Sequence, residues 1–415
     1  MYDGEQLFRH ESGRIVAALT RIFGLENLAL AEDVVQDTFC RALEVWKIRG
    51  VPDNPSAWLM KAAKNRAIDL LRRERTARRF APELARLFES EWTLVPTVNG
   101  IFTDETLKDD QLRMMFTCCD PHISEEAQVA VTLNLLAGFT ASEIASSFLT
   151  TRAAIEKRIE RAKKVLSASK SLFDLTDRDL PERLSAVHRT LYLLFNEGYH
   201  GASKSGSVRV ELCREAMRLA SLLLDKPLVA SPATYALCAL MWLHAGRLPA
   251  RVDGHGELVA LGDQDRTLWD ARLIAKGNEF LELSASGSEL SEYHVEAAIA
   301  SIHCTAARAE DTNWERIVWL YDTLMAIRPS PVIALNRAIA LAQQSGPERG
   351  IQEIHAIEQR ERLQSYPFFA AALGELELRA GRVDRARKHF EEAAALARNP
   401  MERRFLENRI QAASR

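Results

Sequence analysis

Apolar residues recur every three or four positions along most of the chain, the spacing that puts side chains on one face of an α-helix. No stretch reads as a central strand. The spacing predicts a first helix over about residues 5–23, with Gly24 as its stop. Its buried face should carry Phe8, Ile15, Leu19 and Ile22. The pattern therefore predicts an all-α protein.

Two more helices follow in the predicted N-terminal domain. The second begins near Asn27, and its buried stripe should be Ala31, Val35, Phe39, Ala42 and Trp46. The third opens after a turn-rich segment, with Asn54 suited to the N-cap and Pro55 to the first helical position, and should continue to about residue 79. Together the three helices predict one small domain over residues 1–80.

A second helical domain is predicted over residues 106–168, after an aperiodic linker at 81–105. Near its end Thr140 and Glu143 have the spacing of a capping box, which marks the start of a helix. Ile144, Ala145 and Phe148 of this helix have the spacing to pack against the next helix, which is basic. Their expected partners there are Ile155, Ile159 and Ala162. The spacing favours a DNA-binding helix-turn-helix, although a helical hairpin inside any bundle has a similar pattern.

From residue 169 to 415 the sequence pattern differs from that of the preceding domains and predicts Ala- and Leu-rich helical pairs. Near the end, one stretch fits the pattern of a tetratricopeptide repeat. The matching positions are Leu373, Gly374, Ala386, Phe390, Ala393 and Pro400. Such repeats stack into an extended surface that generally binds a partner, so this region is predicted to be a TPR-like helical extension.

Charge is strongly segregated, although the formal net charge of the 415 residues is only −3. Residues 47–80 hold ten basic and three acidic residues, and residues 152–166 hold six basic and two acidic ones. Between them, residues 81–150 hold three basic and eleven acidic residues. Two basic islands around an acidic spacer indicate two phosphate-contacting surfaces, and solvated helix faces are the alternative.

The six cysteines are scattered, which predicts reduced thiols and no disulfide framework. Cys118 and Cys119, followed by His122, suggest zinc, but adjacent cysteines rarely bind one ion, and they are better placed at a helix end. We therefore predict no metal and no cofactor. No apolar run is long enough for a membrane span, so we expect a cytoplasmic protein without a membrane partner.

Two polar stretches of the C-terminal region remain open to interpretation. Asn196, Glu197, Tyr199 and His200 suit a ligand pocket, yet Gly198 beside them reads equally well as a helix C-cap. The cluster of Asp263, Asp265 and Arg266 is interpreted as a buried salt-bridge network. The sequence contains no dinucleotide-binding, Walker, zinc-protease or serine-hydrolase motif. No motif therefore supports an enzymatic function.

Three motifs in order resemble bacterial RNA polymerase sigma factors of the extracytoplasmic-function (ECF) type, in the sigma-70 family. AEDVVQDTFCRALEVW (31–46) resembles their polymerase-binding helix, and AWLMKAAKNRAIDLLRR (57–73) resembles the helix at the melted promoter. EIASSFLTTRAAIEKRIERAKK (143–164) resembles the helix-turn-helix of their second domain, although Leu149 stands where many such turns have Gly. Residues 169–415 resemble the TPR-like extension of one subgroup.

The resemblance implies a function and a set of site residues. The chain would bind core RNA polymerase and direct promoter-specific transcription initiation, with activity set by the fused extension, which itself has a possible protein partner or ligand. Core-binding residues would be Asp33, Gln36, Asp37 and Arg41. Residues for minus-ten DNA would be Lys61, Lys64, Asn65, Arg66, Arg72 and Arg73, and those for minus-thirty-five DNA Arg152, Lys157, Arg158, Arg161 and Lys164.

Two other classes of function remain open. A freestanding helix-turn-helix regulator with a repeat-type sensor domain accounts for residues 106–415 but leaves the helices at 31–46 and 57–73 unexplained. An enzyme hidden in the C-terminal region requires a convergent polar pocket, which the sequence alone does not reveal.

Overall fold

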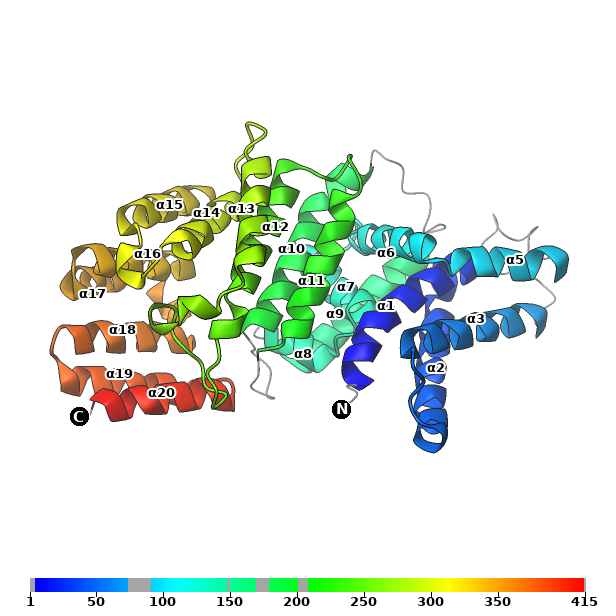
Figure 1. Cartoon of the computed structure of the whole chain (residues 1–415), viewed down its shortest axis with the longest axis horizontal. Helices are drawn as coiled ribbons and strands as arrows, with labels where there is room; N and C mark the ends of the chain where they lie inside the picture. Colours follow the sequence, from blue (N-terminus) through cyan, green and yellow to red (C-terminus); the bar gives the residue numbers. More distant parts are fainter. Residues whose placement is uncertain (1–3, 74–90, 148–149, 169–178, 201–207, 414–415) are drawn as a thin grey trace. The chain divides into compact units, whose positions relative to one another are not determined.

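The computed structural model describes residues 4–73, 91–147, 150–168, 179–200 and 208–413. These residues form helices and connecting turns and include no strand, so the predicted all-α class is confirmed (Figure 1). The chain divides into two compact units. Unit 1 comprises residues 1–194 and 221–229, and unit 2 comprises residues 195–220 and 230–415.

The first three helices of unit 1 lie where the apolar spacing predicts them. They are α1 (Gly4–Phe23), α2 (Leu28–Arg49) and α3 (Pro55–Arg73), with a short 3₁₀ turn, η1 (Leu25–Asn27), after α1. Gly24 ends α1 with a φ of 86°, a backbone conformation that favours glycine. Asn54 caps α3 by accepting a hydrogen bond from the Ala57 amide at 2.9 Å. The expected continuation of the third helix beyond Arg73 lies outside the described residues.

Part of the predicted irregular linker is a helix, α5 (Glu91–Ile101). The sequence expectation was wrong here because Pro96 and the weak apolar period argue against a helix, whereas tertiary packing favours one. Val98 and Ile101 are fully or almost fully buried, and α5 packs against α3 and α6. The linker residues 81–90 lie outside the described part of the chain.

Four helices follow in unit 1: α6 (Asp104–Cys118), α7 (Glu125–Leu136), α8 (Ala141–Ser147) and α9 (Arg152–Ala168). Helix α7 is the centre of this group, since nine of its twelve residues are buried. Helix α1 packs directly against α6 and α7. A Cβ added at Gly13 would lie 2.1 Å from the Leu136 carbonyl oxygen, so only glycine allows this close approach.

Two long helices contribute to both units. The first part of α10 (Asp179–His200) and the end of α11 (Val210–Leu224) belong to unit 1, and the rest of each belongs to unit 2. Arg183 forms an ion pair with Asp120 at 3.3 Å, and Lys226 forms one with Asp109 at 2.9 Å. Unit 1 therefore includes residues beyond 168, and the domain boundaries expected from the sequence stay predictions.

Unit 2 continues as a series of helices that pack on their neighbours in chain order. The helices are α12 (Pro232–Gly246), α13 (Ala271–Ser284), α14 (Glu292–Thr305), α15 (Trp314–Ile327), α16 (Pro331–Ser345), α17 (Pro347–His355), α18 (Pro367–Arg379), α19 (Val383–Ala395) and α20 (Pro400–Ala413). Short 3₁₀ turns are η3 (Leu248–Ala250), η4 (Leu261–Asp263), η5 (Arg266–Leu268), η6 (Ala309–Asp311) and η7 (Arg360–Leu363).

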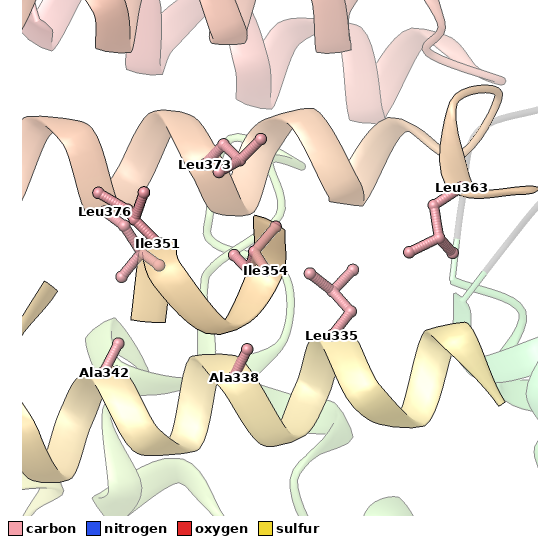
Figure 2. Close-up of a cluster of buried hydrophobic side chains, with 8 residues drawn as sticks. All are labelled: Leu335, Ala338, Ala342, Ile351, Ile354, Leu363, Leu373 and Leu376. Carbon is pink, nitrogen blue, oxygen red and sulfur yellow. The ribbon is translucent and has the colours of Figure 1, made fainter. Parts of the chain in front are cut away.

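Successive hydrophobic clusters hold this series together. Figure 2 shows one of them, in which α16, α17 and α18 contribute side chains to a shared core. Its buried members are Leu335, Ala338, Ala342, Ile351, Ile354, Leu363, Leu373 and Leu376. In the next cluster Ala386, Phe390 and Ala393 are buried, and a Cβ at Gly374 would meet the Phe390 ring at 2.8 Å. Each helical pair buries its apolar face only against its neighbours, as in repeat proteins.

In the described parts of the chain, no helix combines the length and the apolarity that a membrane span requires.

Candidate nucleic-acid interface

Four polar residues predicted to contact a partner lie together on the solvent side of α2. Asp33, Gln36, Asp37 and Arg41 are all exposed, and we call them the α2 ridge. The opposite face of the helix is buried and carries Ala31, Val34, Val35, Thr38 and Ala42. Phe39 and Trp46 are half-buried and contact Phe8 and Trp58 edge-on. The ridge is therefore available to a partner without any change in the core.

Apolar side chains near the end of α2 are also left in water. Leu43, Ile48 and Val51 are 66%, 85% and 46% exposed. Burying a side chain of this kind is worth about 1.5–3 kcal/mol, so a partner that covers them gains binding energy. Sequence reasoning missed these residues. The available signal was their position outside the buried stripe of the helix.

The predicted DNA-contacting residues of α3 line one accessible face. Lys61, Asn65 and Arg72 are exposed, and Lys64 and Arg66 are half-buried. The guanidinium of Arg66 lies 3.6 Å from the carboxylate of Asp37, so a residue predicted to contact DNA touches the α2 ridge. Asp37 is largely exposed and Arg66 partly so, and such a surface pair contributes less than about 1 kcal/mol. The side chain of Arg73 lies outside the described residues.

A pocket of about 650 Å³ lies beside this face, with walls from α3 and α5. Arg14, Lys61 and Lys64 supply positive charge to it. The remaining polar and aromatic lining includes Asn54, Asn65, Asn99 and Phe102. Cations suit phosphate oxygens, whereas amides and an aromatic ring suit the edge and face of a base. Sequence reasoning found the α3 residues but missed the α5 wall, because that segment was not predicted to be helical.

The predicted capping box is present at the start of α8. The Thr140 amide donates to Glu143 Oε2 at 2.8 Å, and the Glu143 amide donates to Thr140 Oγ1 at 3.3 Å. Ile144 and Ala145 of α8 are buried, as are Ile155 and Ile159 of α9, and the two helices pack together. Phe148 and Leu149 of the intervening turn lie outside the described residues. Buried apolar residues on both sides of the turn thus pack the two helices together.

Helix α9 presents most of its predicted DNA-contacting cations to solvent. Lys157, Arg161 and Lys164 are exposed. Arg152 is also exposed and pairs with Glu156 of the same helix at 2.7 Å. Arg158 is half-buried and pairs with Glu126 of α7 at 2.7 Å. Lys157, Arg161 and Lys164 are therefore exposed on α9, whereas Arg158 also links α9 to α7 through its ion pair with Glu126.

Ion pairs join the first three helices to the later helices of unit 1. Arg9 of α1 lies 2.6 Å from Glu143 of α8. Arg21 of α1 lies 2.8 Å from Asp110 of α6, whose pKa burial raises to about 6 in spite of this arginine. Lys163 of α9 lies 2.6 Å from Glu32 of α2. The two groups of predicted DNA-contacting helices are thus held in one compact body.

The neighbouring cysteines end a helix, as predicted, since α6 ends at Cys118 and Cys119 is its C-cap. Both side chains are buried, and burial raises the pKa of the Cys118 thiol to about 12. Among the described residues, no group of three or more His, Cys, Asp or Glu side chains is arranged to hold a metal ion.

Two interpretations of the C-terminal polar stretches were wrong. Gly198 is not a C-cap, because α10 continues to His200. A Cβ at this position would lie 2.8 Å from the Arg209 carbonyl oxygen, so the glycine permits close packing of α11. The stretch 263–266 forms no buried salt-bridge network, because Asp263 and Asp265 are exposed. Asp265 instead caps η5 through the Thr267 amide, and Arg266 donates to backbone carbonyls.

Glu197, Tyr199 and His200 do come together with residues from later in unit 2. Glu197 is buried and pairs with buried Arg209 at 2.8 Å. Tyr199 accepts a hydrogen bond from Arg247, and Arg251 lies near His200. Arg209 is 12 residues from Glu197, whereas Arg247 and Arg251 are 48 and 51 residues from Tyr199 and His200, so no local pattern indicated these two arginines.

Comparison with known proteins gives matches to two family models and to one relative over nearly the whole chain. Residues 7–77 match sigma-70 region 2, and residues 183–285 match a family of unknown function, DUF6596. An uncharacterised protein of Rhizobium meliloti (strain 1021), R00370, is 37% identical over 394 residues, which cover 94% of this chain and 91% of that protein. No solved structure matches.

Proposed function

The chain belongs to the family of the Rhizobium meliloti protein and carries region 2 of the sigma-70 factors, and on this premise we propose that it is an ECF-type sigma factor. A sigma factor acts in transcription initiation and is not an enzyme. In this proposal the chain binds core RNA polymerase in the cytoplasm and directs it to specific promoters. The observation that carries the proposal is the exposed α2 ridge inside the matched region.

The α2 ridge would form the polymerase contact. Its two carboxylates, one amide and one guanidinium suit a charged, elongated partner surface such as a coiled coil. The exposed Leu43 and Ile48 would supply the apolar part of the same interface. Polar groups then fix orientation, and the buried apolar groups contribute most of the affinity.

The α3 face and the adjoining pocket would hold the melted strand of the minus-ten element. Unstacking a base costs a few kcal/mol, which phosphate neutralisation and pocket contacts can offset. Lys61 and Lys64 serve the first purpose, and Asn54, Asn65 and Phe102 serve the second. This division of roles requires a single strand, because duplex DNA does not present a free base to the pocket.

Helix α9 would read the minus-thirty-five element as the second helix of a helix-turn-helix. Its exposed Lys157, Arg161 and Lys164 can hold phosphates or contact guanine edges in the major groove. The capping box at Thr140 and Glu143 supports this proposal, because it defines where the supporting helix begins.

The packing of unit 1 suggests that the free protein is in a closed state, in which the α3 face and α9 are held in one compact body. The two promoter elements lie about 85 Å apart along B-form DNA, at 3.4 Å per base pair. A compact body of roughly 200 residues, such as unit 1, has a radius of gyration of only about 16 Å. The α3 face and α9 therefore cannot reach their two promoter elements at the same time until these helices move apart. We propose that core polymerase provides this separation, so the free chain binds duplex promoter DNA poorly.

The repeat-like unit 2 would set the activity of the factor, with a positive role preferred. Its pairwise helical packing suits a docking surface for the sigma domains, for polymerase or for another partner. Arg183 on α10 and Lys226, just after the end of α11, pair with acidic residues within unit 1. Residues 179–194 and 221–229, which the sequence assigns to the extension, belong to unit 1, so a change in them can alter unit 1.

Direct binding measurements separate this proposal from a freestanding regulator. The full chain is mixed with core polymerase for size-exclusion chromatography, and separately with duplex DNA from upstream of its own gene for a gel shift. Stable co-elution with core and a weak, unspecific shift support the proposal. A tight, sequence-specific shift by the chain alone at physiological salt, without co-elution, would establish the regulator instead.

A further inference from the structure

Unit 2 contains a buried arginine that forms no ion pair with a carboxylate of the described residues. Arg247, the C-cap residue of α12, is 4% exposed. Its Nη2 donates to Tyr199 Oη at 3.3 Å and lies 2.5 Å from His244 Nδ1. Its Nε is buried and has no hydrogen-bond partner. A buried guanidinium normally has an anionic partner, and no described carboxylate forms an ion pair with this one.

Two more arginines in the same region make hydrogen bonds and ring contacts with neutral groups. The Arg251 guanidinium lies over the Tyr199 ring at 4.2 Å, and its Nε donates to the Tyr199 carbonyl oxygen at 2.9 Å. The Arg266 guanidinium lies over the Trp269 ring at 4.7 Å and donates to the His303 carbonyl oxygen at 2.8 Å. The indole Nε1 of Trp269 is a second buried donor without a partner. The region thus combines surplus donors with surplus positive charge.

The histidines between these arginines add no charge at neutral pH. Burial, together with nearby arginines, lowers the pKa of His200 and of His303 to about 3. Burial and the same arginines hold the pKa of His244 well below its usual range. Acidic groups near the cluster include Glu296, towards Tyr321, and Glu310 and Asp311, towards Arg266. Glu211 lies near Cys213 beside Arg251, and Glu402 is paired with Arg398, which acts on His200. Asp311 is itself hydrogen-bonded to Arg308.

The cluster is accessible from solvent. The His200 side chain is exposed, and Arg251, Arg266 and His244 are half-buried, whereas Arg247 is buried. A small molecule can therefore approach Arg251 and Arg266 without unfolding the unit.

We propose that Arg247, Arg251 and Arg266 form a binding site for a small phosphate-bearing molecule. A phosphate group carries close to two negative charges near neutral pH, and its oxygens accept several hydrogen bonds from guanidinium donors at once. It would balance the charge of Arg247 and accept from the buried Nε of that residue. A bound ligand would give unit 2 a chemical signal to respond to, a consequence that rests on the proposed function, whereas the site itself does not.

The test is calorimetric titration of the full-length chain with inorganic phosphate, at constant ionic strength in chloride. We expect one saturable site per chain. Arg251→Gln should weaken binding about 10-fold or more, because a charge-assisted contact is lost. Arg316→Gln is the matched control, since Arg316 lies over the Trp319 ring at the same 4.2 Å but is outside the cluster. The control should bind phosphate as the parent does.

Two further measurements on the unmodified chain test the proposal even if a variant is unstable. Glycerol phosphate and acetate are titrated into the unmodified chain, and the His200 resonance is followed by NMR. Tighter binding of glycerol phosphate than of inorganic phosphate identifies an organic ester as the ligand class, and equal binding identifies the phosphate group alone. Phosphate should move the His200 resonance and raise the pKa of this residue. No saturable binding below about 10 mM phosphate, equal binding of acetate, or equal weakening by Arg316→Gln overturns the proposal.

Discussion

Arg9 Nη2 lies 2.6 Å from Glu143 Oε1, so an ion pair joins α1 to the start of α8. The same Glu143 accepts the Thr140 amide in the capping box. Burial would raise the pKa of Glu143, but the Thr140 hydrogen bond and the Arg9 charge lower it further than burial raises it. One carboxylate therefore both starts a helix of the candidate DNA-binding pair and holds that pair against α1.

Arg9→Met should loosen unit 1. The substitution keeps an apolar stem but removes the charge, and loss of a partly buried pair should lower the free energy of unfolding by about 1–3 kcal/mol. Small-angle scattering should report a larger radius of gyration, and binding of duplex promoter DNA should increase. Glu156→Gln is the control, because it removes only an exposed pair within α9 and should change stability by less than about 0.5 kcal/mol. An unchanged radius and unchanged DNA binding in Arg9→Met would refute the closed state.

Asp37→Arg should weaken binding to core polymerase while α2 stays folded. Position 37 is exposed and lies off the buried stripe, so the circular dichroism spectrum should not change. The substitution also places a second cation beside Arg66. Arg66→Gln breaks the same ion pair from the other side and should leave core affinity intact but reduce promoter use. Equal core affinity of Asp37→Arg and the parent would show that the α2 ridge is wrongly assigned.

Lys157→Ala should reduce promoter binding by the polymerase complex by about 1–3 kcal/mol if Lys157 contacts a base. Core binding should be unaffected, because the residue is exposed on α9 and not on the α2 ridge. Arg158→Ala should combine a loss of promoter use with a loss of stability, since Arg158 also pairs with Glu126. Lys276→Ala in unit 2, which removes an exposed lysine paired with Glu279, is the control in footprinting at fixed salt. Full promoter occupancy with Lys157→Ala and Arg158→Ala together would exclude α9 as the reading helix.

Acid should destabilise unit 1 through His188 of α10. Burial lowers the pKa of this residue from 6.5 to about 4, so between these values the unfolded chain binds the extra proton. The free energy of unfolding should therefore fall by about 3 kcal/mol as the pH is lowered from 6.5 to 4. Urea denaturation across this range measures the slope, and His188→Gln should reduce it. The same slope in both proteins would contradict the assignment.

The stability of a truncated chain should depend on whether it retains residues 179–194 and 221–229 of unit 1. A chain stopped near Ser171 lacks residues 179–194 and 221–229 of unit 1, including buried Val187 and Leu191. It should be less stable than a chain stopped after Ala230, which retains both segments. Transcription and core binding of the longer fragment then report on the repeats alone. Lost transcription with retained core binding supports a positive role of unit 2, a rise indicates autoinhibition, and no change removes the regulatory role.

The features that the sequence predicted well depend on neighbours close in the chain. The Thr140–Glu143 capping box and the Asn54 cap each join residues three positions apart, and both are present. The Leu373, Ala386 and Phe390 pattern correctly predicted buried positions of paired helices. Gly24 was also correctly placed as a helix stop.

Features that depend on distant contacts were not predictable in this way. The Arg9–Glu143 pair spans 134 positions, and the Arg247 cluster combines segments from α10 to α14. Helix α5 forms in spite of Pro96 because Val98 and Ile101 are buried by other helices. The apolar periodicity of a segment cannot report the partner that another segment supplies.

Run-off transcription tests the central claim most directly. Purified chain and core polymerase are combined on a linear template that carries the DNA upstream of the chain's own gene, with core alone and the Asp37→Arg chain as controls. The account predicts a discrete transcript with the parent chain, little or none with core alone, and a strong reduction with Asp37→Arg that excess variant partly restores. Transcription by core that is indifferent to the chain, while core and chain are both active in other assays, would contradict it.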